Sequence, residues 1–382
     1  MMAEKTAERL PQTEQKANDR GLLDLPFLLL TVILVSIGVI MMYSASYPRA
    51  FQEEGNGMYY FIRQAIFAVA GILVMLGFSR IGYQIWRRFA FTILGAAIVL
   101  LILVLIIGRS GGGAKRWIYI GPVSIQPSEL AKFGVVVSFS GMIAGLKDKI
   151  RTLKYGVLPF VIMLVPIVLL LALEPHLSAI VIICLTAAAL LYLGGLPGKW
   201  FLMLFAAAAV FIGAYLALRG YASDRITAWL HPEDFAQTKG YQVLQSLYAI
   251  GSGGLFGLGF GKSRQKYLYL PEEHNDYIFS IVCEELGFVG AALIIVLFAL
   301  LIIRGYWIAM HAPDRFGKLV AAGLTTLLAL QVALNIGVVS NVLPSTGISL
   351  PFFSYGGTAL IVQLAEMGIV LNISRSCKNN LL

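Results

Sequence analysis

LPFLLLTVILVSIGVIMM, from Leu25 to Met42, contains no charged residue and decides the class of fold. A helix needs about 20 apolar residues to cross the roughly 30 Å of hydrocarbon in a bilayer. The apolar core of a secretory signal is shorter, about 7–15 residues. We therefore interpret this segment and its flanks as an uncleaved first transmembrane helix.

Apolar runs of this kind recur along the whole chain. The mean hydropathy is +0.81. Hydrophobic residues make up 58% of the sequence and charged residues 13%, whereas about a quarter of a soluble protein is charged. The sequence predicts an all-α polytopic membrane protein with about ten transmembrane helices, at 24–46, 59–79, 89–108, 126–146, 155–173, 177–195, 199–218, 277–303, 317–342 and 358–374.

Lys and Arg residues set the expected orientation. With the N-terminus inside, most of them fall in inner loops and tails, and the short outer loops hold only Arg49, Arg109, Lys115 and Arg116. This asymmetry places both termini in the cytoplasm. We expect a disordered cytoplasmic tail at 1–23, a membrane domain at 24–375 and a short cytoplasmic tail at 376–382.

One outer loop, about 219–276 between spans seven and eight, is much longer than the others. It is too rich in aromatic and apolar residues to be disordered, so we expect it to fold back onto the membrane surface. Its segment GSGGLFGLGFGKS lacks the first glycine of a phosphate-binding loop, because Phe256 stands there. The glycines are better suited to a tight turn or a close approach of helices.

The composition also bears on ligands. The net charge of +9 is spread over loops, and no basic stretch has interleaved aromatics, so nucleic acid is not an expected partner. Cys184, Cys283 and Cys377 are far apart and show no metal-ligand spacing, which favours small core residues. No metal site is predicted from the residues.

Acidic residues concentrate in YLYLPEEHNDYIFSIVCEELG, from Tyr267 to Gly287. Asp276 has two compatible interpretations. It is a favoured N-cap for a helix that starts at Tyr277. It also lies at the membrane boundary, where the pKa of a carboxylate can rise toward that of a working base. The cap alone does not explain the other acidic and titratable residues nearby, which are Glu272, Glu273, His274, Glu284 and Glu285.

A second polar segment is SGGGAKRWIYIGPVSIQPSELAKF, from Ser110 to Phe133. Pro127 fits the first position of span four. Glu129 and Lys132 are three residues apart on the expected helix, so they can form an ion pair inside the membrane boundary. An ion pair in that position is costly, so we interpret it as part of a functional site. Lys115 and Arg116 lie upstream on the same side and suit a phosphate group.

Two shorter outer segments have open interpretations. Glu174 and His176 lie in the turn between spans five and six. Glu174 is either a solvated acid in a simple connecting turn, or both residues are titrating groups near a site. PSTGISLPFFSYGG, from Pro344 to Gly357, predicts a kinked, re-entrant turn that is structural or shapes the substrate site.

These motifs together resemble the SEDS family (shape, elongation, division and sporulation). The matching segments are GAKRWIYIG, IQPSELAKF, GYQVLQSLYAIGSGGLFGLGFGKSRQKYLYLPEEHNDYIF, EELGFVG and PSTGISLPFFSYGG, and the similarity runs over all the expected spans. GKSRQKYLYLPE is more similar to the FtsW and SpoVE branch than to RodA.

The resemblance implies a peptidoglycan glycosyltransferase that polymerises lipid II beside a class B penicillin-binding transpeptidase and other division or sporulation proteins. It places the essential aspartate at Asp276, the basic residue of the RW motif at Arg116, and the acid and lysine of a third motif at Glu129 and Lys132. The remaining substrate-binding expectations within these motifs are Lys115, Gln245, Ser246, Arg264, Lys266, Glu272, His274 and Ser354.

The chain departs from the family in one turn. The family has an aspartate in a PDLG turn, whereas EPHLS here has His176 and Ser178. Any role of that aspartate is in doubt, although the adjacent Glu174 could substitute.

The implied reaction needs a base to take a proton from the acceptor 4-hydroxyl and cations to neutralise undecaprenyl pyrophosphate as it leaves. Because the linkage inverts, no covalent intermediate is required. Acids and pyrophosphate together could hold Mg²⁺ or Mn²⁺. The alternative from another class is a flippase for a lipid-linked precursor, but such sites usually lie near the bilayer midplane.

Overall fold

The computed structural model describes residues 21–111, 114–121, 123–218, 229–238 and 240–377. Within these ranges, eight helical spans are long and apolar enough to cross a membrane. The long helices that form them are α2 (Leu25–Glu54), α3 (Tyr59–Phe78), α4 (Gln84–Ile107), α5 (Pro127–Leu146), α7 (Leu158–Leu173), α12 (Ile278–His311), α13 (Arg315–Val339) and α14 (Gly357–Ser374).

Two further helices lie where spans six and seven are expected. They are α8 (Leu177–Leu193), with 17 residues, and α9 (Gly198–Leu218), with 21 residues. The all-α polytopic fold is therefore confirmed, and every expected span has a helix. That all ten cross the bilayer stays a prediction. The remaining helical pieces are short: η1 (Lys147–Arg151), α6 (Leu153–Gly156), η2 (Glu233–Phe235) and α11 (Tyr241–Ser252).

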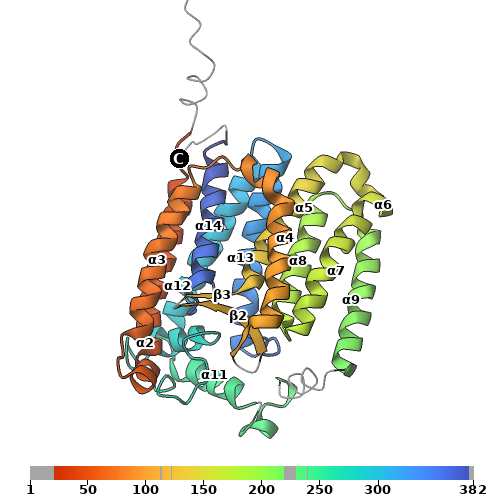
Figure 1. The fold of residues 1–382 in the computed structure, drawn as a ribbon. Helices are drawn as coiled ribbons and strands as arrows, with labels where there is room; N and C mark the ends of the chain where they lie inside the picture. Colours follow the sequence, from red (N-terminus) through yellow and green to blue (C-terminus); the bar gives the residue numbers. More distant parts are fainter. Residues whose placement is uncertain (1–20, 112–113, 122, 219–228, 239, 378–382) are drawn as a thin grey trace, which may run out of the picture.

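A small sheet between α4 and α5 was not expected. Its strands are β1 (Arg109–Gly111), β2 (Ala114–Ile120) and β3 (Val123–Ile125), paired antiparallel in the order β1-β2-β3. Gly121, with φ of 60°, begins the turn after β2. Figure 1 shows the sheet toward the end of the bundle that holds α11, and β2 packs against α4 and β3 against α14. The sheet therefore brings Arg116 on β2 to the end of the helices that holds α11.

The helices are arranged around a buried centre. In their most apolar stretches, 78% of α14 and 72% of α13 are buried inside the protein, against 22% of α3. Both ends of the described chain lie on one face, where the Gly21 amide donates to the Arg375 carbonyl at 3.1 Å. Figure 1 shows α11 and its neighbouring loops on the opposite face. This arrangement agrees with termini on one side and the long loop on the other.

The glycine-rich segment of the long loop packs against a break in α12. At Gly287 the backbone leaves the helical region, with φ of 67° and ψ of −170°. On one side of the break, Leu258 donates its amide to the Glu284 carbonyl at 2.9 Å. On the other, Phe288 donates to the Gly254 carbonyl at 2.9 Å. A side chain at Gly257 would collide with the Glu285 carbonyl. The expected role of these glycines in close backbone approach is confirmed.

Candidate active site

Asp276 lies immediately before α12, which packs against α11. It is half-buried, but its expected role as the helix N-cap is wrong. The helix begins at Ile278, Tyr277 occupies the N-cap position, and no side-chain cap bond is formed. The chain is turned back at Glu272, whose φ is 57° and whose carbonyl accepts from the Tyr277 amide. Asp276 therefore precedes the helix without capping it.

The carboxylate of Asp276 lies beside the loop between α13 and α14. A Cβ atom built on Gly347 would be 3.1 Å from Asp276 Oδ2. Gly347 also has φ of 70°, which favours glycine. The segment predicted to be structural or substrate-shaping therefore forms one wall of the candidate site.

The expected Glu129–Lys132 pair is confirmed. Lys132 Nζ lies 2.7 Å from Glu129 Oε2, and both side chains are buried. Glu366 of α14 is a third buried titratable group near this pair. Glu366 was not predicted from the sequence, although an acid inside an apolar span is itself a signal of function.

Arg116 reaches the turn between α7 and α8. Its Nε donates to the Glu174 carbonyl at 3.5 Å, and its Nη2 donates to the Pro175 carbonyl. These two bonds to the main chain hold the basic residue of the RW motif against the turn that contains Glu174 and His176.

Glu174 and His176 are both buried in that turn, so the interpretation as a solvated acid is wrong. Burial raises the pKa of the Glu174 carboxyl to about 8, partly opposed by the charge of Arg116. Burial also lowers the pKa of His176 well below its ordinary value, and Arg116 and Lys132 lower it further. Near neutral pH the carboxyl is therefore largely protonated and the imidazole neutral.

The same turn reaches the wall beside Asp276. Ser178 Oγ donates to the Thr346 carbonyl, one residue before Gly347. This bond joins the start of α8 to the loop between α13 and α14. The structure therefore brings the EPHLS turn, Arg116 and Asp276 into one region, although they are far apart in sequence.

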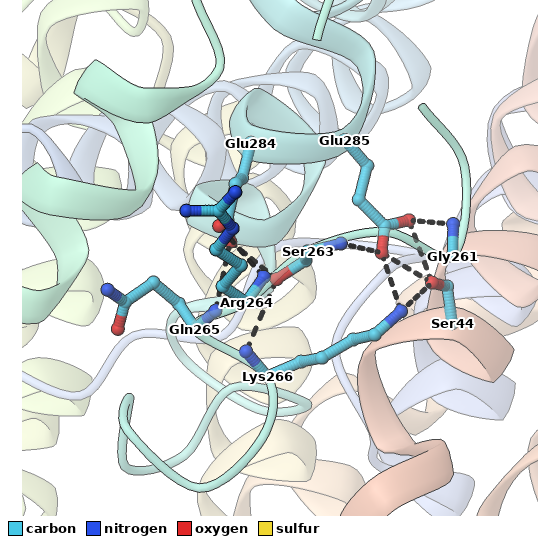
Figure 2. A network of polar contacts seen from close by, with 8 residues as sticks. All are labelled: Ser44, Gly261, Ser263, Arg264, Gln265, Lys266, Glu284 and Glu285. Carbon is cyan, nitrogen blue, oxygen red and sulfur yellow. Dashed lines mark hydrogen bonds and ion pairs between the residues drawn. The ribbon is translucent and has the colours of Figure 1, made fainter. Parts of the chain in front are cut away.

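Glu284 and Glu285 have a different role from the acids around Asp276. Figure 2 shows the loop 261–266 wrapped around their two carboxylates. Glu285 accepts from the amides of Gly261 at 3.0 Å and Ser263 at 3.2 Å. Glu284 accepts from the amides of Arg264 and Gln265 and from the Ser263 hydroxyl. The two carboxylates fasten this loop to α12.

Lys266 completes the fastening. Its ammonium lies 2.8 Å from Glu285 and 3.0 Å from the Ser44 hydroxyl of α2 (Figure 2). The side chain is 4% exposed. The expectation that Lys266 binds substrate does not fit this placement, because its charge is already neutralised inside the protein. Arg264 is exposed and stays a candidate for an anionic ligand.

Three expected substrate-binding residues lie on α11 or in the loop before α14. Ser246 is buried and links helices through the Ser280 hydroxyl and the Val339 carbonyl. Ser354 accepts from the Leu350 amide and donates to the Asn275 carbonyl, each at 2.7 Å. The two serines thus hold neighbouring segments in place, and their expected role in substrate binding stays a prediction. Gln245 is half-buried beside Ser246.

The other residues before Asp276 divide into buried and exposed groups. Glu273 is fully buried and accepts two bonds from the Arg49 guanidinium, at 2.7 and 2.8 Å. Although burial alone would raise the pKa of Glu273, the neighbouring His274 and the bonded guanidinium of Arg49 lower it. His274 stacks on Tyr60 with ring centroids 4.9 Å apart. Glu272 is exposed and accepts from Asn275 Nδ2.

Arg49 was not expected to be near the site, because it belongs to no recognised motif. Lys115, which was expected there, lies exposed on β2. Among the described residues, no group of three or more His, Cys, Asp or Glu is placed to hold a metal ion. Any Mg²⁺ or Mn²⁺ would need oxygen ligands from the substrate, and its presence stays a prediction.

Comparison with known families gives a match over almost the whole chain. The family model of FtsW, RodA and SpoVE, described as cell cycle protein, matches residues 25–379. A probable peptidoglycan glycosyltransferase FtsW of Trichlorobacter lovleyi is 40% identical over 357 residues, covering 93% of this chain and 94% of that protein. Stage V sporulation protein E of Bacillus subtilis is 38% identical over 355 residues, covering 92% and 97%.

Solved structures show the same fold. A chain from a peptidoglycan synthase complex that coordinates polymerization and crosslinking matches with a TM-score of 0.78 at 28% identity, covering 92% of this chain and 98% of that chain. The rod shape determining protein RodA of Thermus thermophilus matches with a TM-score of 0.70 at 28% identity, covering 94% and 98%.

Proposed function

Because the chain belongs to the family of FtsW, RodA and SpoVE cell cycle proteins, we propose that it is a peptidoglycan glycosyltransferase. It polymerises lipid II into glycan strands during division or sporulation, and undecaprenyl pyrophosphate leaves. The similarity to proteins named as such glycosyltransferases supports this proposal.

The observation that carries the mechanism is the position of Asp276. Its carboxylate lies against Gly347 at the outer end of the bundle and does not cap α12. Arg116 approaches the same region through the turn at Glu174. A carboxylate and a guanidinium near a membrane boundary suit a transfer between two lipid-linked sugars.

In the proposed reaction, Asp276 accepts the proton of the acceptor 4-hydroxyl as the oxygen attacks the anomeric carbon of the donor. The C–O bond to the pyrophosphate breaks at the opposite face, and the electron pair leaves with the pyrophosphate. Arg116, Lys115 and Arg264 supply positive charge for the leaving group. Lys132 is buried and paired with Glu129 on α5.

The proposal includes orientation and partners. Both termini are cytoplasmic, and the loop at about 219–276 is extracytoplasmic. A class B penicillin-binding transpeptidase binds the protein and crosslinks the strands that it makes. The matching chain from a synthase complex that coordinates polymerization and crosslinking supports such a partner.

Purified protein in vesicles, supplied with fluorescent lipid II, tests the function directly. A polymerase gives a ladder of glycan strands on a gel, and Asp276→Asn abolishes the ladder. Transport of labelled lipid II across the bilayer without any ladder would instead establish the flippase alternative.

A further inference from the structure

The segment that carries Asp276 is held by three consecutive backbone carbonyls. The His274 carbonyl accepts from the Tyr355 amide at 3.0 Å. The Asn275 carbonyl accepts from Ser354 Oγ at 2.7 Å, and the Asp276 carbonyl accepts from Asn335 Nδ2 at 2.8 Å. All three donors come from α13 or the loop that follows it. One face of the Asp276 segment is therefore fixed residue by residue.

Asn335 is the donor that bonds to Asp276 itself. It is completely buried on α13, and its Nδ2 donates a second hydrogen to the Ile348 carbonyl at 2.6 Å. Ile348 follows Gly347, where an added Cβ would lie 3.1 Å from Asp276 Oδ2. The single amide group of Asn335 thus joins the main chain of Asp276 to the loop that faces its carboxylate.

The carbonyl oxygen of the Asn335 amide adds no further hydrogen bond within the described part of the chain. Asn335 Oδ1 is buried and has no hydrogen-bond partner among the described residues. Burying a polar atom without a partner is unfavourable. The contribution of Asn335 therefore comes from its two N–H donations, which set the spacing between Asp276 and the loop at 347–348.

We propose that Asn335 is a positioning residue for Asp276, which holds the carboxylate at the distance from Gly347 that proton abstraction requires. The inference rests on the proposed role of Asp276 as the base. A displacement of about 1 Å at a reacting group can cost about 10²-fold in rate. Substrate binding depends on other groups, so loss of Asn335 lowers kcat and leaves KM near the wild-type value.

The test uses Asn335→Asp, which keeps the size of the side chain and removes both donors, together with Asn335→Ala. Polymerisation of lipid II is measured over a range of substrate concentrations in detergent. The matched control is Asn372→Asp. Asn372 is also buried and bonded to main chain, through Tyr83 and Ser79, but at the opposite end of the bundle. Melting temperatures of all variants are measured alongside.

We expect both Asn335 variants to lose about 10²-fold in kcat at little change in KM, whereas Asn372→Asp lowers the melting temperature and keeps kcat. Equal kcat losses in the two Asn→Asp variants at equal melting temperature would overturn the positioning role, as would a loss expressed only in KM.

If the Asn335 variants fail to fold, Gly347→Ala tests the same positioning role. Its Cβ would press on Asp276 Oδ2 while leaving Asn335 intact, and the same selective loss of kcat is expected. Unchanged kcat in folded Gly347→Ala would contradict the proposal. The two hypotheses fail separately: ladders from Asp276→Asn would remove the base, whereas inactive Asp276→Asn with fully active Asn335→Asp would remove only the positioning role.

Discussion

The ammonium of Lys266 lies 2.8 Å from the carboxylate of Glu285, and both side chains are almost completely buried. This pair joins the long loop before α12 to that helix, and Ser44 extends the contact to α2. The acids between Tyr267 and Gly287 therefore have different roles. Glu284 and Glu285 fasten a loop, Glu273 binds Arg49, and Asp276 lies beside Gly347.

Replacement of Lys266 should mainly lower the stability of the protein, and any effect on catalysis should follow from that loss. Lys266→Met leaves the Glu285 carboxylate buried without its cation, which typically costs about 3–5 kcal/mol. We expect a clear drop in the melting temperature in detergent, with Lys262→Met as the control because Lys262 is exposed on the same loop. A variant that stays as stable as the control but binds lipid II poorly would return Lys266 to the substrate site.

Asp276→Asn should abolish polymerisation in a protein that remains folded. General-base catalysis is worth about 10²–10⁴ in rate, and Asn keeps the size of the side chain while removing the basic oxygen. Gel ladders from lipid II and the melting temperature measure the two effects separately. If the folded variant still makes nearly normal ladders, the base must be sought at Glu272 or His274.

Arg116→Ala should lower kcat/KM by about 10- to 10²-fold, because hydrogen bonds to a charged group contribute about 1.5–3 kcal/mol. Arg49 is unsuitable as the control, since it holds buried Glu273. Lys262→Ala removes an exposed outer charge and should retain nearly full activity. Similar activity in the two variants would contradict the assignment of Arg116 to the leaving group.

Glu174 should make stability depend on pH. The pKa of its carboxyl is raised in the folded protein from an ordinary value of 4.5 to about 8. The folded state therefore binds the proton more tightly, and this stabilisation is complete below about pH 4.5 and lost as the pH rises through about 8. The side chain at position 174 cannot ionise in Glu174→Gln. The melting temperature of this variant should therefore rise relative to that of the wild type as the pH increases from 5 to 8.

The control for this pH series is Glu233→Gln, which replaces an exposed acid of the outer loop. Its melting temperature should change with pH in the same way as that of the wild type. The same result for Glu174→Gln would show that the Glu174 carboxyl ionises as an ordinary exposed acid does.

Topology can be checked by labelling single cysteines in a variant without the three native ones. Lys262→Cys on the outer loop should react with a membrane-impermeant reagent in intact cells. Lys149→Cys, in the η1 segment after α5, should react only after permeabilisation. Reaction of Lys262→Cys solely from the cytoplasmic side would invert the proposed orientation.

The sequence alone determined the features that depend on residues close to one another along the chain. Apolar length located every long helix, because crossing a bilayer is a requirement on one continuous segment. Pro127 at the start of α5 and the pair of Glu129 with Lys132 were equally local, since residues three apart share a helix face. The short sheet escaped notice because two of its three strands, β1 and β3, have only three residues each.

Tertiary structure decided which charged groups face a ligand and which are neutralised inside the protein. Arg49 meets Glu273 across 224 positions of sequence, and Asn335 meets Asp276 across 59. Lys266 and Arg264 look alike in the motif, yet one is buried against Glu285 and the other is exposed. No local pattern distinguishes them, because the free energy of a charge in a membrane protein depends on the partner that packing brings to it from another helix.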